Sequence, residues 1–345
     1  MAIAIMLLFF GATTPTLAQP TTTTPTPLHS AHTLYVGGTG PNNYTTIQQA
    51  LDASTNGDTI YVYHNNAPYH ETLTITTSIT LQGENKTTTI IKGFRHKDTA
   101  TIHASNVTIT GFTFQGARSQ FAAIWSLGTY ETITNCIIDH ASYGIAFTNL
   151  NVQHPSHHRV QANIIRNTKI GIEFIMAQNY SIITDNDIED SSEIGIGYQG
   201  NNATIAHNTI NHSPYVGIDI YGDYNLINKN TIQNNTQTYT HGAAGISIFG
   251  TNNTITANNL LHCKRNAMQI QYITWHQRFF NTGKNNTWNG NYWGQPVNGT
   301  YTIKGRAEVE GLPFGLWIHV PFIGWLPWIS YDYHPAPTPI DINSQ

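Results

Sequence analysis

Glu173 and Asp219 occupy the same place in a short phrase that returns along this sequence. The phrase opens Gly-Ile and then alternates, as in Gly171-Ile-Glu-Phe, Gly195-Ile-Gly-Tyr and Gly217-Ile-Asp-Ile. Alternate side chains of a strand point to opposite faces, so both carboxyl groups should face outward in one column. Inverting glycosidases hold two carboxyl groups about 6.5–9.5 Å apart, with room for a water. The two acids are therefore candidate catalytic residues for polysaccharide cleavage.

Gly197 falls between the two acids in the repeat and should leave a dip between their side chains. No second acid crowds Glu173 or Asp219 in this pattern, so the sequence gives no reason for a raised pKa. The alternative interpretation is a pair of ordinary solvated side chains. Both interpretations stay open at this point.

Four further side chains are predicted to share the outward face of these strands. Tyr221 and Phe249 follow Gly-Ile pairs at outward positions and could stack on sugar rings. Gln199 and Gln269 are expected on the same face. These residues are candidates for carbohydrate binding without catalysis.

His154, His157 and His158 form the dense histidine group of the chain, in the stretch HPSHH. Imidazole suits copper or zinc, so the group is a candidate metal site. It lies in an insertion between repeats, and with four Met in the chain there is no Met-rich copper patch. Solvated loop histidines are the alternative.

The acidic run TDNDIEDSSE is a candidate calcium site, with Asp185, Asp187, Glu189 and Asp190 as its possible ligands. Calcium takes six or more oxygen ligands. Alternate members of a strand point to opposite faces, so the run need not form one site. We therefore predict no cofactor and keep copper and calcium as alternatives.

The acids and aromatics recur because the chain is built from repeats. A row of asparagines returns at steps of 22 to 28 residues: Asn135, Asn163, Asn186, Asn208, Asn230 and Asn258. Isoleucine, valine and aromatic residues at alternate positions between them indicate short strands. A unit of this length cannot bury its own apolar face, so it must stack on its neighbours. Leucine-rich repeats would need leucine at the core positions, and propeller blades would need a period near 40 residues.

We therefore predict an all-β, right-handed parallel β-helix, a solenoid of stacked coils. The asparagines should mark one corner, because asparagine tolerates the left-handed backbone of a sharp turn. Their amides should bond from coil to coil as a structural ladder. Cys136 and Cys263 would lie five coils apart, about 24 Å at the strand spacing, so no disulfide should join them.

The two ends of the chain differ from the repeats. Residues 1–18 end in Thr16-Leu-Ala18 and are predicted to be a signal peptide, cleaved or kept as an anchor, and residues 19–33 a Thr/Pro linker. Residues 34–100 should hold an amino-terminal cap and the first coils, with a helix at Thr45–Ala53. Residues 101–294 should be the β-helix repeats.

Residues 295–345 should form a carboxy-terminal cap, an aromatic and proline-rich plug over the last coil. Trp325 and Tyr331 would pack in the plug, or would meet lipid if the segment touches a membrane. Pro313, Pro321 and Pro327 interrupt any helix there, so no span is expected in the mature chain.

The opening YTTIQQALDASTNGDTIYVY, the later NYWG and the closing PWISYDYHPAPTPIDI resemble the NosD-like subset of pectin-lyase-like right-handed β-helix proteins, in its archaeal secreted form. The resemblance implies the fold and a periplasmic copper-binding description, but the fold hosts many activities.

We expect a secreted or cell-surface module that binds carbohydrate or another surface component, such as a polysaccharide of the cell envelope. The alternatives are a polysaccharide hydrolase or lyase using the Glu173/Asp219 face, and a copper-handling accessory protein. We favour binding over catalysis, and the question of an enzyme stays open. A net charge of −4 argues against nucleic acid as a partner.

Overall fold

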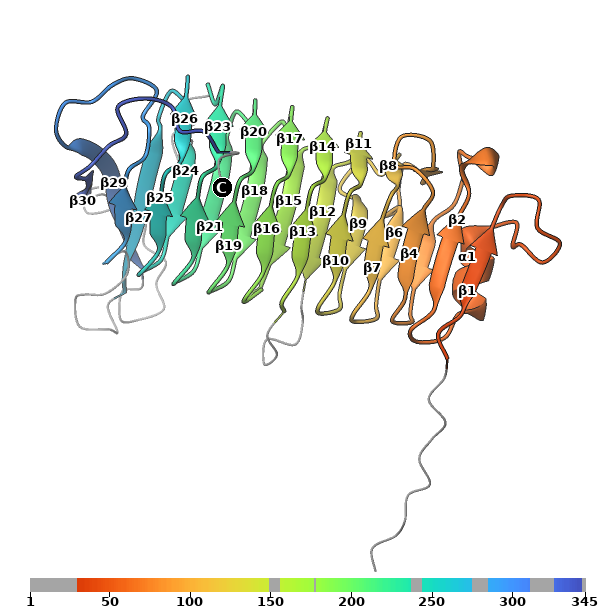
Figure 1. Cartoon of the computed structure of the whole chain (residues 1–345). Coiled ribbons are helices and arrows are strands. Elements are labelled where there is room, and N and C mark those ends of the chain that lie inside the picture. Colours follow the sequence, from red (N-terminus) through yellow and green to blue (C-terminus); the bar gives the residue numbers. More distant parts are fainter. Residues whose placement is uncertain are drawn as a thin grey trace, which may run out of the picture. The chain divides into compact units, whose positions relative to one another are not determined.

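The computed structural model describes residues 30–148, 156–176, 178–236, 244–274, 285–310 and 326–342. Residues 31–345 form one compact unit. Within it, parallel strands stack coil on coil in chain order, from β1 to β29 (Figure 1). The predicted right-handed parallel β-helix is confirmed.

Each full coil contributes three strands, which stack into three columns. In column 1, Ile109, Ile133 and Val160 pair in parallel and stack in the interior. Each buried isoleucine or valine of this kind stabilises the fold by roughly 1.5–3 kcal/mol. The strands of column 1 are β1 (Thr33–Val36), β2 (Thr59–Val62), β4 (Thr80–Gly83), β7 (Thr108–Thr110), β10 (Thr132–Thr134), β13 (Arg159–Gln161), β16 (Ile182–Thr184), β19 (Thr204–Ala206), β22 (Leu226–Asn228), β25 (Thr254–Thr256) and β28 (Thr287–Asn289).

Column 2 is the separate eight-stranded sheet. Its middle positions, such as Ile138, Ile165 and Ile188, are buried and in register. The strands of column 2 are β5 (Ile90–Lys92), β8 (Thr113–Gln115), β11 (Ile137–Asp139), β14 (Ile164–Arg166), β17 (Asp187–Glu189), β20 (Thr209–Asn211), β23 (Thr231–Gln233) and β26 (Asn259–Leu261).

Column 3 has the longest strands, and it carries both candidate acids. Its inward side chains include Ile172, Ile196 and Ile218, which stack in register. The strands of column 3 are β3 (Leu73–Ile75), β6 (Ala100–Ile102), β9 (Ala122–Ser126), β12 (Tyr143–Thr148), β15 (Ile170–Ile175), β18 (Ile194–Gln199), β21 (Val216–Tyr221), β24 (Ala244–Phe249), β27 (Ala267–Thr274) and β29 (Tyr301–Glu310).

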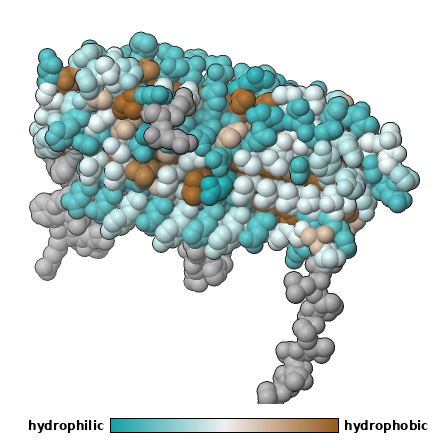
Figure 2. Space-filling model, in the orientation of Figure 1, coloured by the Kyte–Doolittle hydropathy of each residue, from teal (hydrophilic) through white to brown (hydrophobic). Residues whose placement is uncertain are grey.

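The alternation that buries isoleucine inside leaves polar residues outside. Figure 2 shows one face of the molecule, where hydrophilic and intermediate residues predominate and apolar residues form small separate patches. Outward positions therefore decide what the surface can bind.

The asparagine ladder runs along the corner between columns 1 and 2. The Nδ2 atom of Asn186 donates to Oδ1 of Asn208 at 2.9 Å, and Asn208 donates in the same way to Asn230 at 3.0 Å. The same bond joins Asn163 to Asn186, Asn230 to Asn258 and Asn258 to Asn291. The predicted ladder is therefore present from Asn163 onward.

Two details of the ladder prediction are wrong. Asn135 is exposed, and Cys136 takes the ladder position, where its backbone N–H donates to Oδ1 of Asn163 at 2.9 Å. The left-handed conformation belongs to the residue before each ladder asparagine, as at Ala162 and Lys229, with φ of 56° and 52°. The asparagine itself turns its amide inward, since it must reach the coils on either side.

Both cysteines are free, as predicted. Burial raises the pKa of the Cys136 thiol to about 12 and that of Cys263 to about 11. Neither thiol is therefore poised for nucleophilic chemistry.

A short helix, α1 (Ile47–Ala53), lies within the predicted range Thr45–Ala53. The hydroxyl of Thr46 caps it by accepting a bond from Gln49, and Ile47, Ala50 and Leu51 are buried in the main core. Its neighbours are the first strands, β1, β2 and β3. A single 3₁₀ turn, η1 (His64–Asn66), follows β2.

At the carboxy-terminal end, β30 (Leu326–Asp332) pairs antiparallel with β29. Asp332 is buried, and its Oδ2 accepts bonds from the Asn291 side chain at 3.2 Å and from Trp293 Nε1 at 3.2 Å. The ladder thus ends on a carboxylate. Tyr331 is 42% exposed, and Trp325 lies outside the described residues.

Candidate functional site

Glu173 and Asp219 lie in line with each other on the outward side of the column 3 strands. Glu173 on β15 pairs with Gly197 on β18, and Gly197 pairs with Asp219 on β21. The backbones of the two acids are therefore two strand spacings, or about 10 Å, apart. The predicted shared column is present.

Gly197 does not leave an empty dip between the two acids. A Cβ atom placed on Gly197 would lie 2.5 Å from Oε2 of Glu173, so the Glu173 carboxyl group already fills that space. The Glu173 side chain therefore leans along the column toward Asp219.

The expectation of ordinary acidities is wrong, because the fold desolvates both groups. Burial, and then the charge of Asp219, raise the pKa of Glu173 to about 7. Burial raises the pKa of Asp219 to about 6, against the opposing effect of a hydrogen bond with Ser247. Oε2 of Glu173 is buried without a hydrogen-bond partner among the described residues. One carboxyl group of the pair can therefore hold a proton near neutral pH.

Tyr221 and Phe249 adjoin the acid column on the outward side. They are in register on β21 and β24, and their rings stack with centroids 5.0 Å apart. Tyr221 is 41% exposed. Gln199 pairs with Tyr221 from the preceding coil, and its Oε1 accepts a bond from the Met176 backbone at 3.2 Å. Three predicted binding residues therefore lie side by side on consecutive coils.

Gln269 is not part of this surface, so its predicted placement is wrong. It pairs with the inward-facing Ile248 and is 1% exposed. Its Oε1 accepts bonds from Ser330 at 2.8 Å and Trp288 Nε1 at 3.3 Å. Its role in the described structure is to satisfy polar groups under the last coils.

The two candidate histidines that the structure describes, His157 and His158, do not converge. His154 lies outside the described residues. His157 is exposed, and its ring stacks between Tyr130 and Tyr180 with centroids 5.1 Å from each. His158 is buried, with Nδ1 2.6 Å from the Glu131 carboxylate. Because the neighbouring histidines point to opposite sides of the wall, these described residues do not fit a copper ion.

The acidic run also divides between different environments. Asp185 accepts a bond from Gln161 at 3.1 Å at one corner, and Asp190 pairs with His212 at 2.8 Å at another. Asp187 and Glu189 lie between them on β17. Among the described residues, no three His, Cys, Asp or Glu side chains gather to hold a metal ion.

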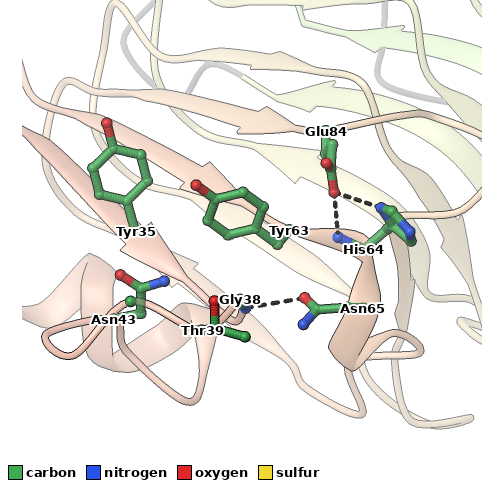
Figure 3. A pocket seen from close by; sticks show the side chains of 9 residues that line it. Tyr35, Gly38, Thr39, Asn43, Tyr63, His64, Asn65 and Glu84 are labelled. Carbon is green, nitrogen blue, oxygen red and sulfur yellow. Dashed lines mark hydrogen bonds and ion pairs between the residues drawn. The ribbon is translucent and has the colours of Figure 1, made fainter.

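The sequence did not point to a hollow of about 540 Å³ near the amino-terminal end (Figure 3). Tyr35 and Tyr63 form an aromatic wall with ring centroids 6.1 Å apart. Next to Tyr63, hydrogen bonds from the backbone and ring of His64 hold the pKa of Glu84 below its ordinary value. The sequence signal that could have predicted this hollow is the alternation in TLYV and TIYVY, because it places the tyrosines on one outward face.

Comparisons with known proteins agree with this architecture. A family model described as "Periplasmic copper-binding protein (NosD)" matches residues 51–298. No curated protein matches the chain. No helix in the described part of the chain has the length and apolar character needed to cross a membrane.

Several solved structures are similar to the chain at low identity. The Dettilon tailspike protein gp208 is 13% identical with a TM-score of 0.47, over 80% of this chain and 62% of the tailspike. Pectin methylesterase from carrot is 14% identical with a TM-score of 0.46, over 75% and 81%. Alginate lyase from Paenibacillus sp. str. FPU-7 is 13% identical with a TM-score of 0.41, over 81% and 94%. The chain thus spans less than two thirds of the tailspike, and TM-scores below 0.5 carry no inference about activity.

Proposed function

We propose a function for this chain, which belongs to the NosD family of β-helix proteins. It is a secreted or cell-surface module that binds carbohydrate on the outward face of column 3. The single observation that carries the proposal is the stacked Tyr221–Phe249 pair beside the Glu173–Asp219 column. Export by the segment 1–18 is part of the proposal, and the expected partner is a polysaccharide or another cell-envelope component.

The chemistry of these side chains suits a sugar chain. An aromatic ring offers an apolar surface for the C–H face of a sugar, while the hydroxyl group of a tyrosine remains in contact with solvent. Gln199 and the Glu173 carboxyl group supply donors and acceptors for hydroxyl groups. Strands repeat every 4.8 Å or so, so successive coils present such groups to an extended ligand at a regular spacing.

A glycan array tests the proposal. The wild-type chain should bind at least one class of glycan, and Tyr221→Ala should weaken that binding about tenfold or more. Tyr224→Ala is the matched control, because Tyr224 is 61% exposed but lies beyond the strand, at the next corner. Absence of any glycan ligand, or equal effects of the two variants, would refute the proposal.

Glycoside cleavage at Glu173 and Asp219 is the second candidate function. The observation that favours it is the raised pKa of both groups, about 7 and about 6. A carboxyl group that stays protonated near neutrality can act as general acid, and its ionised neighbour as base or nucleophile. Release of reducing ends or of unsaturated products from a bound glycan, lost in both Glu173→Gln and Asp219→Asn, would establish it. Binding without turnover would leave the module non-catalytic.

A further inference from the structure

A second hollow, of about 400 Å³, opens at the corner after column 2, in the first coils. His70, Lys92, Arg95 and Arg118 line it together with Phe94, and no acidic residue does. Phe94 is 54% exposed. In a chain of which 10% is charged and whose net charge is −4, this is a local concentration of positive charge.

Two consecutive coils have glycine at this corner, and both glycines line the hollow. Gly93 follows β5 and Gly116 follows β8, at the place where the next coils carry His140 and Asn167. A Cβ atom on Gly116 would lie 2.4 Å from the Gly93 carbonyl oxygen, and φ of Gly116 is +109°. Glycine is therefore required at position 116, because the backbones of the two coils approach too closely there for a side chain.

Lys92, Arg95 and Arg118 have no counterion among the residues that the structure describes. Ion pairs do occur elsewhere in the described structure, at Arg166 and Lys169 on later coils. The nearest acid in sequence, Asp98, is engaged by the Ala122 backbone N–H at 2.7 Å. Like charges held around one site repel each other unless an anion joins them.

We propose that this hollow binds the carboxylate or sulfate groups of an acidic polysaccharide. The guanidinium groups of Arg95 and Arg118 can each form paired hydrogen bonds to such an oxyanion. The exposed Phe94 ring beside them offers a surface for the sugar that bears it. The site lies at the end of column 2 and the corner after it in the first coils. It does not involve Glu173, Asp219 or Tyr221, so it stands or fails independently of the proposed function.

Binding of heparin and of polygalacturonate, with neutral dextran as the comparison polymer, tests the proposal. The wild-type chain should bind the acidic polymers and not dextran, and the affinity should fall as salt rises. The double variant Arg95→Gln/Arg118→Gln should raise Kd about tenfold or more. Arg166→Gln is the matched control on the same face, because its guanidinium already lies 3.4 Å from Asp139; it should change Kd less than twofold.

Two further arms separate the possible outcomes. Equal binding of acidic polymers by the double variant and the control would overturn the proposal. The proposal would also be overturned if the wild-type chain bound inorganic sulfate or phosphate but did not bind the acidic polymers. Tyr221→Ala should leave acidic-polymer binding unchanged, so the failure of either site is visible on its own. The salt dependence of the wild-type chain is a second measurement that needs no variant.

Discussion

Nδ1 of His158 lies 2.6 Å from Oε2 of Glu131, and both side chains are completely buried. The two atoms are in close polar contact without the alignment of a hydrogen bond. The other ring nitrogen, Nε2, lies 3.0 Å from Oε1 of Gln178, and the ring packs against Phe147 with centroids 4.3 Å apart. The two residues occupy the same corner in consecutive coils, so two turns of the solenoid are joined by a buried polar contact.

Replacement of His158 by alanine should destabilise the fold strongly. It would leave Glu131 buried without its partner, and breaking a buried pair in this way costs about 3–5 kcal/mol. Urea denaturation measures the loss. His212→Ala is the control, because the His212–Asp190 pair has side chains 56% and 60% exposed and should change stability by less than about 1 kcal/mol. Equal losses would contradict the role assigned to burial.

Asn208→Ala should lower the free energy of unfolding by about 3 kcal/mol, since each buried polar group left unsatisfied costs about 1–3 kcal/mol. The variant loses the donation to Asn230, removes one of the two acceptors of Asn186 Nδ2 and leaves the buried Asn186 backbone N–H without its acceptor. Thermal or urea unfolding measures the effect. Asn135→Gly, at an exposed position with φ of 50°, should be close to neutral; a large loss there would place Asn135 in the ladder after all.

Gly197→Ala should change the site while sparing the fold. The new Cβ would meet the end of the flexible Glu173 side chain at 2.5 Å, so the carboxyl group can swing away. Glycan binding or turnover should fall and the melting temperature should change little. At Gly144 the new Cβ would meet the Gly171 carbonyl oxygen at 2.3 Å, so Gly144→Ala should instead lower the melting temperature. The reverse order would refute this account.

Stability should fall as pH rises from about 4.5 to 7. Folding raises the pKa of Glu173 from 4.5 to about 7 and that of Asp219 from 3.8 to about 6, so the folded chain binds more protons than the unfolded chain in this range. The contribution is complete below the unfolded pKa values and is lost as pH passes the folded ones. Melting temperatures of the wild-type chain and of Glu173→Gln/Asp219→Asn measure it. The variant should lose less stability between pH 5 and 8, and parallel curves would contradict the assignment.

The sequence was sufficient for the coil, its strands and the shared column of Glu173 and Asp219. These features follow from the alternation of apolar and polar residues along each strand and from the restriction of inward positions to a few apolar residue types. Both signals are local and recur in every coil. The helix at Ile47–Ala53 was equally predictable, because its three buried residues recur at helical spacing.

The registers at Asn135 and Gln269 were predicted wrongly at places where the repeat departs from its pattern. Asn135 and Cys136 are adjacent, and only the packing shows that the thiol takes the inward position. Ala267 pairs with Ile246, so it stands for the isoleucine of the Gly-Ile phrase and not for the glycine. A shift of one residue then turns Gln269 inward.

The acidity of the site was not predictable from spacing alone. Alternation assigns a side chain to a face, but it does not say how a long side chain leans along that face. Glu173 fills the space over Gly197 and is desolvated there. Desolvation depends on neighbours from other coils and from the ends of strands, which a single repeat does not reveal.

The hydrogen bond from Asn291 to Asp332 determines when the asparagine ladder can be completed during synthesis of the chain. Each amide in the row donates one N–H to a backbone carbonyl made earlier and the other to a residue made later, and for Asn291 that later residue follows by 41 positions. In a nascent chain that still lacks β30, one N–H of the Asn291 side-chain amide therefore has no carboxylate acceptor. Translation has to reach the last strand before the whole row can close.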